Sequence, residues 1–375
     1  MKNPFSTFGY DGPEYFCDRV EETNRLTKLL ENGNHVTLIS PRRMGKTVLL
    51  KHCFSQERLR KDYYLFIIDI YATKSLSEFV YSLGRSILSV LKSKERKVWE
   101  RFIQIAGSFR TGITLDEFGK PSWNLQVGDI KTPHVSLDEI FQYLSKADKP
   151  CFVAIDEFQS IVSYKEKNVE ALLRTYIQEC NNAMFVFSGS KRRMMGEMFS
   201  SPSRPFYQSS STISLKAIPL NSYKQFIKYH FENNGRLIND ETIENLYSRF
   251  DGVTWYIQKI CNEMFFNSDQ GDVLTVEDVD RSIYISVKEK EDVYQDFFSR
   301  LSSNQKTLLT ALAKSESEIH PMGGDFIKKA NLSSASSVQR GLKSFEDKDI
   351  ITVENGKYHI YDYFLLYWLR NNEYN

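Results

Sequence analysis

The sequence predicts an α/β protein built on a parallel β-sheet that helices cover on both faces. Three observations support this prediction. Short apolar runs that indicate buried strands alternate with runs of helical periodicity along residues 35–220. The first strand leads into a glycine-containing loop, SPRRMGKT, and the loop leads into a helix. A later strand, CFVAI, runs directly into two carboxylates, Asp156 and Glu157.

Length and composition indicate a soluble globular protein. A chain of 375 residues is too long for one ordinary core, so we expect two or three domains. The formal net charge of +1 gives no support for a protein that coats nucleic acid or anionic lipid non-specifically. Five scattered cysteines without a C-x-x-C indicate buried thiols in a reducing cytosol. The N-terminal segment MKNPFSTFGYDGPEYF lacks the apolar core of a signal peptide, and no apolar run approaches the ~20 residues that span a bilayer, so we expect a cytoplasmic protein without a membrane partner.

The first elements follow in order from the N-terminus. DRVEETNRLTKLLENGNH predicts a helix with a possible cap at Asp18 and a stop at Asn32-Gly33. HVTLIS is a β-branched strand, and VLLKHCFSQERLRK is the helix that follows the loop. YYLFIIDIY predicts a second strand over 63–71, with a helix from about Ser77 to Ile105 after it.

The middle of the chain completes the sheet. The stretch RTGITLDEFGKPSWNLQVGD is rich in turn residues and predicts a β-hairpin or loop insertion near 107–135. SLDEIFQYLSKA predicts a helix that begins with a capping box from Ser136 to Glu139. The segments CFVAI, NAMFVFSGS and STISLKAIPL are the remaining predicted strands.

After Pro219 the pattern is helical to about residue 298, with breaks at Gly235, Gly252 and Gly271. Three short helices follow, and two strands in ITVENGKYHIY are joined by Asn355-Gly356, a strong hairpin signal. Three helices and a hairpin outline a winged helix-turn-helix. The predicted domains are a core over 1–218, a helical lid over 219–298 and a winged helix over 299–375.

The loop resembles the phosphate-binding pattern G-x-x-x-x-G-K-[ST] except that Ser40 stands at the first position. Lys46 can reach the β- and γ-phosphates of ATP, and the Thr47 hydroxyl can bind Mg²⁺. Backbone N–H groups and the following helix N-terminus would form an anion nest. Serine is small enough for the first position if its φ is negative. The alternative is a chance G-K-T in a surface loop. The predicted nucleotide-binding residues are Ser40, Pro41, Arg42, Arg43, Met44, Gly45, Lys46, Thr47 and Val48.

The acidic strand end supplies the other half of an ATP site. Asp156 is placed to hold the Mg²⁺ shell, and Glu157 is the natural base for an attacking water, so we predict Glu157 and Lys46 as catalytic residues. The alternative is that both carboxylates cap the following helix. Ser188 or Ser190 could contact the γ-phosphate or the water, or could simply form a small-residue turn. Candidates for a trans-acting arginine finger are Arg192, Arg193 and Arg204.

Four segments, FCDRVEETNRL, LISPRRMGKTVLL, FVAIDEFQSI and FSGSKRRMMGEMF, resemble the archaeal-type ATPase family of the AAA+/STAND branch of P-loop ATPases. The sequence DEFQ is the most distinctive element. GVTWYIQ at 252–258 is similar to the family's lid-helix motif, and YHIYDYFLLYWL is similar to its C-terminal segment. The resemblance covers nearly the whole chain apart from the insertion near 107–135.

The resemblance implies a P-loop NTPase core of AAA+ type, a helical lid and a winged helix. It also implies that Asp18 and Arg19 lie near the adenine or ribose of ATP. The chain departs from the family pattern at Ser40 and at the expected lid arginine, where Thr254, Trp255 and Lys259 stand instead. Slow turnover or a nucleotide-controlled switch therefore fits better than fast hydrolysis.

Three classes of function are compatible with these features. The first is an ATPase or ATP-dependent switch that uses ATP and Mg²⁺ and signals to a protein partner or a second subunit. The second is a winged-helix protein that binds DNA and keeps a structural nucleotide site. Its candidate recognition helix carries Arg340, Lys343 and Lys348 but also three carboxylates, so packing against protein is an equal alternative. The third is a small-molecule kinase, for which we identify no acceptor pocket.

Overall fold

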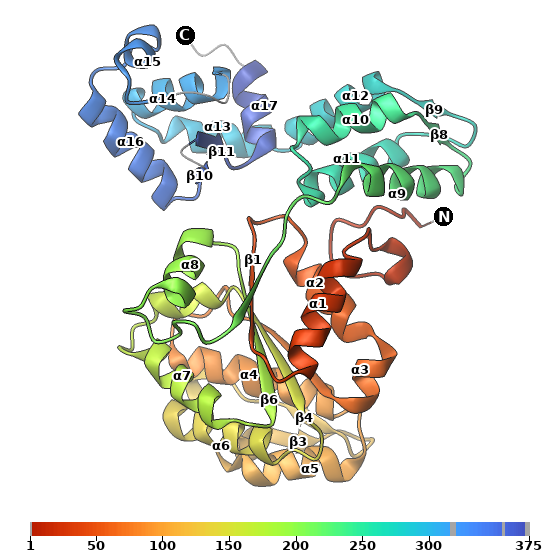
Figure 1. Ribbon diagram of the computed structural model, residues 1–375, viewed down its shortest axis with the longest axis vertical. Helices are drawn as coiled ribbons and strands as arrows, with labels where there is room; N and C mark the ends of the chain where they lie inside the picture. The colour runs from red at the N-terminus through yellow and green to blue at the C-terminus, as the bar shows by residue number, and fades with distance from the viewer. Residues whose placement is uncertain (1, 316–319, 355–356, 372–375) are drawn as a thin grey trace. The chain divides into compact units, whose positions relative to one another are not determined.

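The computed structural model describes residues 2–315, 320–354 and 357–371, which form two compact units (Figure 1). One unit comprises Ser6–Tyr223 together with Val253–Trp255. The other comprises residues up to Phe5, Lys224–Gly252 and the chain from Tyr256 onward. The division into three domains, with boundaries after residues 218 and 298, stays a prediction.

The first unit is built on a five-stranded parallel sheet of order β2-β5-β6-β1-β7. The parallel arrangement confirms the predicted fold class. The strands of this sheet are β1 (Val36–Ile39), β2 (Tyr64–Asp69), β5 (Cys151–Asp156), β6 (Ala183–Gly189) and β7 (Ser211–Ser214).

Helices cover both faces of this sheet because its strands are apolar on both sides. Phe152 and Ala154 of β5 pack with the helices of one face, and Val153 and Ile155 pack with those of the other. The first face carries α1 (Val20–Glu31), α2 (Lys46–Ser55) and α3 (Glu57–Asp62). The second carries α4 (Leu76–Leu91), α5 (Arg96–Ile105), α6 (Pro133–Lys146), α7 (Val169–Glu179) and α8 (Arg192–Ser200).

The predicted insertion contains an antiparallel hairpin of β3 (Ile113–Leu115) and β4 (Pro121–Trp123). Phe109 and Trp123 pack beside Gly84 of α4, where an added Cβ would lie 3.1 Å and 3.0 Å from their rings. The hairpin is thus packed on the core by aromatic side chains.

Four local predictions were wrong. The helix expected from Ser77 to Ile105 is two helices, because the exposed polar run from Lys92 to Lys97 offers no side chain to the core and the chain turns there. The helix over 48–61 likewise breaks at the extended residue Gln56.

The other two errors concern helix starts. The expected capping box of Ser136 and Glu139 lies inside α6, which begins three residues earlier with Pro133 in its first turn. Asp18 does not cap α1, whose N-cap is Arg19 in a left-handed conformation.

The second unit is mainly helical. All three predicted glycine breaks have positive φ, 74° at Gly235, 70° at Gly252 and 97° at Gly271. Its first helices are α9 (Leu220–Glu232), α10 (Asp240–Arg249), α11 (Thr254–Phe266), α12 (Val276–Lys288) and α13 (Glu291–Ser299), with β8 (Leu237–Ile238) pairing β9 (Val273–Leu274); α9 and α11 each begin in the other unit.

Three helices and a hairpin follow, as predicted for a winged helix. They are α14 (Ser303–Lys314), α15 (Gly324–Lys329), α16 (Ala335–Asp347), β10 (Ile351–Glu354), β11 (Lys357–Ile360) and the final α17 (Tyr363–Asn371). The predicted Asn355-Gly356 turn lies outside the described residues. All five cysteines are free and buried, and no described helix is long and apolar enough to cross a membrane.

Candidate nucleotide-binding site

The carboxyl ends of β1, β5 and β6 bring the predicted site residues to one edge of the sheet. Ile39, the last residue before the loop, pairs with Gly189, and Asp69 pairs with Asp156. The loop, both carboxylates and the serines that follow β6 therefore belong to a single compact unit. Ligands of open α/β sheets bind at this edge.

The backbone of the loop explains how Ser40 fits. Ser40 is fully buried and is absent from the residues of positive φ. The left-handed residues of the loop are Arg43, at φ 67°, and Gly45, at φ 89°. The first position therefore makes no use of a glycine's conformational freedom, and a serine Cβ is compatible with it.

Lys46 lies at the start of α2 and is 5% exposed. Its Nζ donates to the carbonyl oxygens of Ser40 and Pro41, at 3.1 Å each, and lies 3.3 Å from the Ser40 hydroxyl. Burial lowers the pKa of Lys46 to about 8, although the carboxylates of Glu157 and Asp156 oppose this shift. The ammonium is thus held within the loop close to two negative charges.

Thr47 and Asp156 are in direct contact, because the Thr47 hydroxyl donates to Oδ2 of Asp156. Asp156 is 3% exposed. Mg²⁺ prefers oxygen ligands, and these two side chains offer a hydroxyl and a carboxylate side by side, so they fit the ion. The described residues contain no cluster of three or more His, Cys, Asp or Glu side chains suited to a metal, so phosphate and water oxygens would complete the shell.

Glu157 is held by two donors on the same oxygen. The Ser190 hydroxyl donates to Oε2 over 2.6 Å, and Nε2 of Gln159 also donates to Oε2. Arg42 joins the network, because its Nε donates to the Ser190 hydroxyl over 3.3 Å. The structure therefore links the loop, the end of β5 and the end of β6 through side chains.

Gln159 is the main residue that sequence reasoning missed. It is 4% exposed, and its Oε1 has no hydrogen-bond partner among the described residues. A Cβ at Gly189 would lie 2.6 Å from this Oε1 and 2.4 Å from Met195, so the space for Gln159 depends on the glycine. The available signal was the DEFQ segment, but nothing in its spacing shows that the glutamine amide turns back onto Glu157.

The two candidate serines differ in their surroundings. Ser190 contacts both Glu157 and Arg42. Ser188 is fully buried in β6, and its hydroxyl has no hydrogen-bond partner among the described residues. Ser190 is therefore the serine that the fold joins to the acidic pair.

Arg19 reaches the loop from the N-terminal segment. Asp18 and Arg19 both have positive φ, 55° and 66°. The Arg19 side chain is buried and donates to the carbonyl of Met44 at 3.3 Å and to Glu22 at 2.7 Å. The contact places Arg19 beside the loop, and the role of this pair at the adenine or ribose stays a prediction.

The three candidate arginines are placed differently. Arg204 pairs with Glu170 at 2.5 Å, and Arg193 pairs with Glu197 at 3.2 Å on an exposed helix face. Arg192 is close enough to Lys46 to contribute to the lowering of its pKa. A finger role for any of them stays a prediction.

The segment Val253–Trp255 packs on the loop within the same unit. The Trp255 N–H donates to the carbonyl of Arg43 at 3.0 Å, and the Arg43 guanidinium lies 4.8 Å from the Trp255 ring centroid. The Thr254 hydroxyl is buried and has no hydrogen-bond partner in the described chain. Lys259, which sequence reasoning grouped with these two, belongs to the other unit, where it pairs with Glu263 and Glu289.

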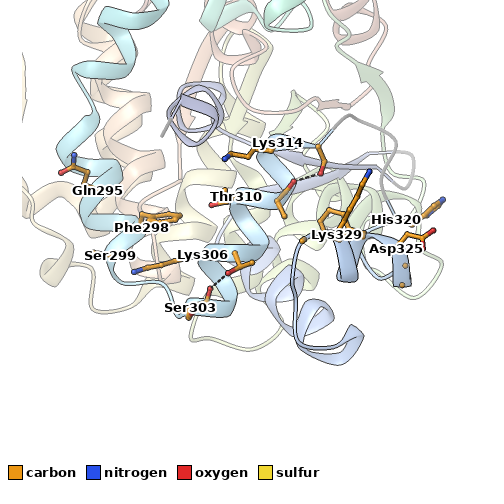
Figure 2. A pocket seen from close by; sticks show the side chains of 17 residues that line it. Gln295, Phe298, Ser299, Ser303, Lys306, Thr310, Lys314, His320, Asp325 and Lys329 are labelled. Atoms are coloured by element: carbon orange, nitrogen blue, oxygen red, sulfur yellow. Dashed lines mark hydrogen bonds between the residues drawn. The ribbon is translucent and has the colours of Figure 1, made fainter. Parts of the chain in front are cut away.

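A hollow of about 1550 Å³ lies in the other unit, between α13, α14 and α15 (Figure 2). Lys306, Lys314 and Lys329 line it together with Asp325. It shares no residue with the loop site.

Two parts of the chain match known protein families. Residues 16–260 match the family described as an ATPase domain predominantly from Archaea. The chain belongs to this ATPase family. Residues 292–371 match a probable winged helix domain. No match was found among curated proteins.

Solved structures show the same fold as this archaeal-type ATPase. The Walker-type ATPase paby2304 of Pyrococcus abyssi has a TM-score of 0.67 at 18% identity, over 98% of this chain and 99% of that one. The Aeropyrum pernix ORC2 protein, solved as ADPNP–ADP complexes, has a TM-score of 0.61 at 14% identity, over 99% and 97%. The Aeropyrum pernix ORC1 protein in complex with DNA has a TM-score of 0.50 at 12% identity, over 95% and 93%.

Proposed function

We infer that this protein binds ATP with Mg²⁺, hydrolyses it slowly and uses the bound nucleotide as a conformational switch. The observation that carries this proposal is the contact between Thr47 and Asp156 beside the buried ammonium of Lys46. The ammonium of Lys46 can bind phosphate, and the two side-chain oxygen groups beside it can bind Mg²⁺, as expected of an ATP site.

Each residue would have a distinct task. The loop N–H groups and Lys46 would bind the phosphates, while Thr47 and Asp156 would hold Mg²⁺, which neutralises phosphate charge. Glu157 would take a proton from the water that attacks the γ-phosphorus, and the bond from that phosphorus to the bridging oxygen would break to leave ADP and phosphate.

The hydrogen bonds of Glu157 favour slow turnover. Ser190 and Gln159 both donate to Oε2 of the Glu157 carboxylate. A proton on either oxygen of this carboxylate would weaken both charge-assisted bonds, which raises the cost of the step. A partner protein or a second copy of the chain could supply the change that relieves this restraint, and the predicted lid over 219–298 and winged helix over 299–375 could transmit it.

The deciding experiment measures ATP turnover and Mg-ATP binding by the full chain and by Glu157→Gln and Lys46→Ala. We expect Glu157→Gln to lose turnover, by about 100-fold or more for a lost general base, and to keep ATP binding. Lys46→Ala should lose binding. Release of free phosphate distinguishes hydrolysis from phosphoryl transfer to a metabolite.

Matched controls are Glu117→Gln and Lys120→Ala, two exposed residues in the turn of the hairpin. Neither should change binding or turnover. Unchanged ATP binding in Lys46→Ala would refute the proposed binding site. Tight ATP binding without turnover by the unaltered chain would support a nucleotide-controlled switch and refute the ATPase activity.

DNA binding through the winged helix is a second candidate. The first turns of α16 expose Gln339, Arg340 and Lys343, and the acids Glu346 and Asp347 come only at its end. The N-terminal part of a recognition helix is the part that contacts bases. Salt-dependent DNA binding that survives Lys46→Ala and is lost in Arg340→Glu would support this candidate.

A further inference from the structure

Strand β2 ends the sheet with one open edge. It pairs with β5 through its even-numbered residues, since Tyr64 donates to the carbonyl of Pro150 at 3.0 Å and Ile70 donates to that of Asp156 at 3.2 Å. Backbone groups of neighbouring strand residues point to opposite sides. Those of Leu65 and Ile67 therefore point away from the sheet.

Most of these outward groups have no partner in the described chain. The Ile67 carbonyl accepts a bond from the Ser86 hydroxyl at 3.0 Å. No described backbone or side-chain group bonds the N–H of Leu65, the carbonyl of Leu65 or the N–H of Ile67. These three groups form the repeating pattern to which another strand pairs.

A groove of about 640 Å³ follows this edge within the same unit. Tyr64, Leu65 and Ile67 of β2 line it together with Tyr63, which precedes the strand. Helices α2 and α3 lie on one face of the sheet beside this edge, and α4 lies on the other. The groove thus gives a further strand room to approach the free backbone groups.

The groove is basic. Lys51, Arg60 and Lys94 line it with exposed side chains, and no aspartate or glutamate does. An adjoining hollow of about 540 Å³ shares Ser89 and Ser93 with it. That hollow adds three further basic residues, Arg85, Lys92 and Lys120, and one acid, Asp116.

Asp116 is the one acid among the described residues that line the two hollows, so the basic side chains outnumber it. We propose that the open edge of β2 binds an extended acidic peptide segment of a partner protein, which pairs with Leu65 and Ile67 as an added strand. Backbone pairing supplies affinity in this mode, and flanking charges select the sequence. A nucleic acid would match the charge but would leave the backbone groups of β2 unused.

The test selects octapeptides from a random displayed library on the full chain and measures the binding of the enriched peptides by fluorescence anisotropy. We expect peptides rich in Asp and Glu with β-branched residues between them. The double variant Lys51→Glu, Arg60→Glu should bind them at least tenfold more weakly. Lys61→Glu is the matched control, because Lys61 is exposed on the same helix as Arg60 and does not line the groove.

Backbone pairing is tested separately by N-methylating alternate amides of an enriched peptide. Methylation in one register should abolish binding, methylation in the other should leave it unchanged, and the bound peptide should slow hydrogen exchange at Leu65 and Ile67. Three results would each overturn the proposal. They are equal binding of peptides methylated in either register, no enrichment of acidic peptides, and binding that survives the double charge reversal. Unchanged melting temperatures of the variants ensure that lost binding is not lost folding.

Discussion

Lys46 carries the most informative charge at the residue scale. Burial lowers its pKa from 10.5 to about 8, so its charged form is lost at a pH where exposed lysines keep theirs. Between these two values the unfolded chain binds more protons than the folded one. The contribution of Lys46 to the free energy of unfolding therefore rises with pH across that window.

ATP binding should show the opposite pH dependence, because the phosphates need the protonated amine. We expect the dissociation constant for Mg-ATP to be flat below about pH 7 and to be about tenfold weaker at pH 9. Isothermal titration across this range measures it. Lys46→Arg is the control, since arginine stays charged and should remove the dependence. An equal loss of Mg-ATP affinity at high pH in Lys46→Arg would mean that a group other than Lys46 titrates.

Gln159 tests whether the hydrogen bonds of Glu157 restrain it. Gln159→Leu keeps most of the buried volume and removes one of the two donors to Oε2. A bond to a charged group contributes about 1.5 kcal/mol, so kcat should rise up to about tenfold while the affinity for ATP is unchanged. Single-turnover assays measure the step directly.

The control for that prediction is Gln142→Leu, which removes a similar bond to Asp138 on an exposed helix face. It should leave kcat unchanged. A fall in kcat for Gln159→Leu would mean that Gln159 orients Glu157 for reaction rather than restraining it.

The loop and the acidic pair could be predicted at this scale because their chemistry follows from chain spacing. Ser40 to Thr47 lie within one loop, and Asp156 ends an apolar strand. The contacts of Gln159 and Arg19 could not be predicted, because they depend on left-handed backbone at Glu157 and Arg19, with φ of 56° and 66°. Residues other than glycine adopt this conformation rarely, and sequence gives little warning of it.

At the scale of elements, the strands were predicted more reliably than the helix ends. A buried strand is recognised by an apolar run such as CFVAI. A helix end depends on local backbone geometry. An exposed polar run from Lys92 to Lys97 separates α4 from α5, and the prediction of one long helix passed over it.

Tyr256 joins two elements of the second unit that are distant in the chain. It is 1% exposed in α11, and its hydroxyl donates to Asp362 at 3.1 Å and accepts the N–H of Tyr363 at 3.0 Å. Tyr256→Phe keeps the ring and removes both bonds. We expect the free energy of unfolding to fall by about 1–3 kcal/mol. Urea unfolding measures it, with Tyr284→Phe, whose side chain is 59% exposed, as an unchanged control.

That contact bears on how the molecule is divided. Most of the predicted lid lies in one compact unit with the predicted winged helix, and Tyr256, Asp362 and Tyr363 are among the residues that hold them together. If urea unfolds Tyr256→Phe in a single transition at lower stability, the predicted lid and the predicted winged helix unfold together. Two separate transitions would support independent domains.

At the scale of the whole molecule, α11 is one of two helices, with α9, that begin in the loop's unit and continue in the other. Its first residues, Thr254 and Trp255, belong to that unit, and its remainder belongs to the other. A ligand shifts a conformational equilibrium only through different affinity for the two states. The bond from Trp255 to the Arg43 carbonyl gives phosphate binding a direct route to α11, because Arg43 is part of the loop.

We therefore expect Mg-ATP to change the tryptophan fluorescence of the protein, since nucleotide at the loop would alter the guanidinium that lies 4.8 Å from the Trp255 ring centroid. The change should disappear in Trp255→Phe and persist in Trp123→Phe, whose ring packs in the hairpin. Binding of ATP is measured in parallel, so a silent variant that still binds is distinguished from one that does not. A signal that survives in Trp255→Phe would show that nucleotide reaches the rest of the chain by another route, and α11 would lose its place as the connecting element.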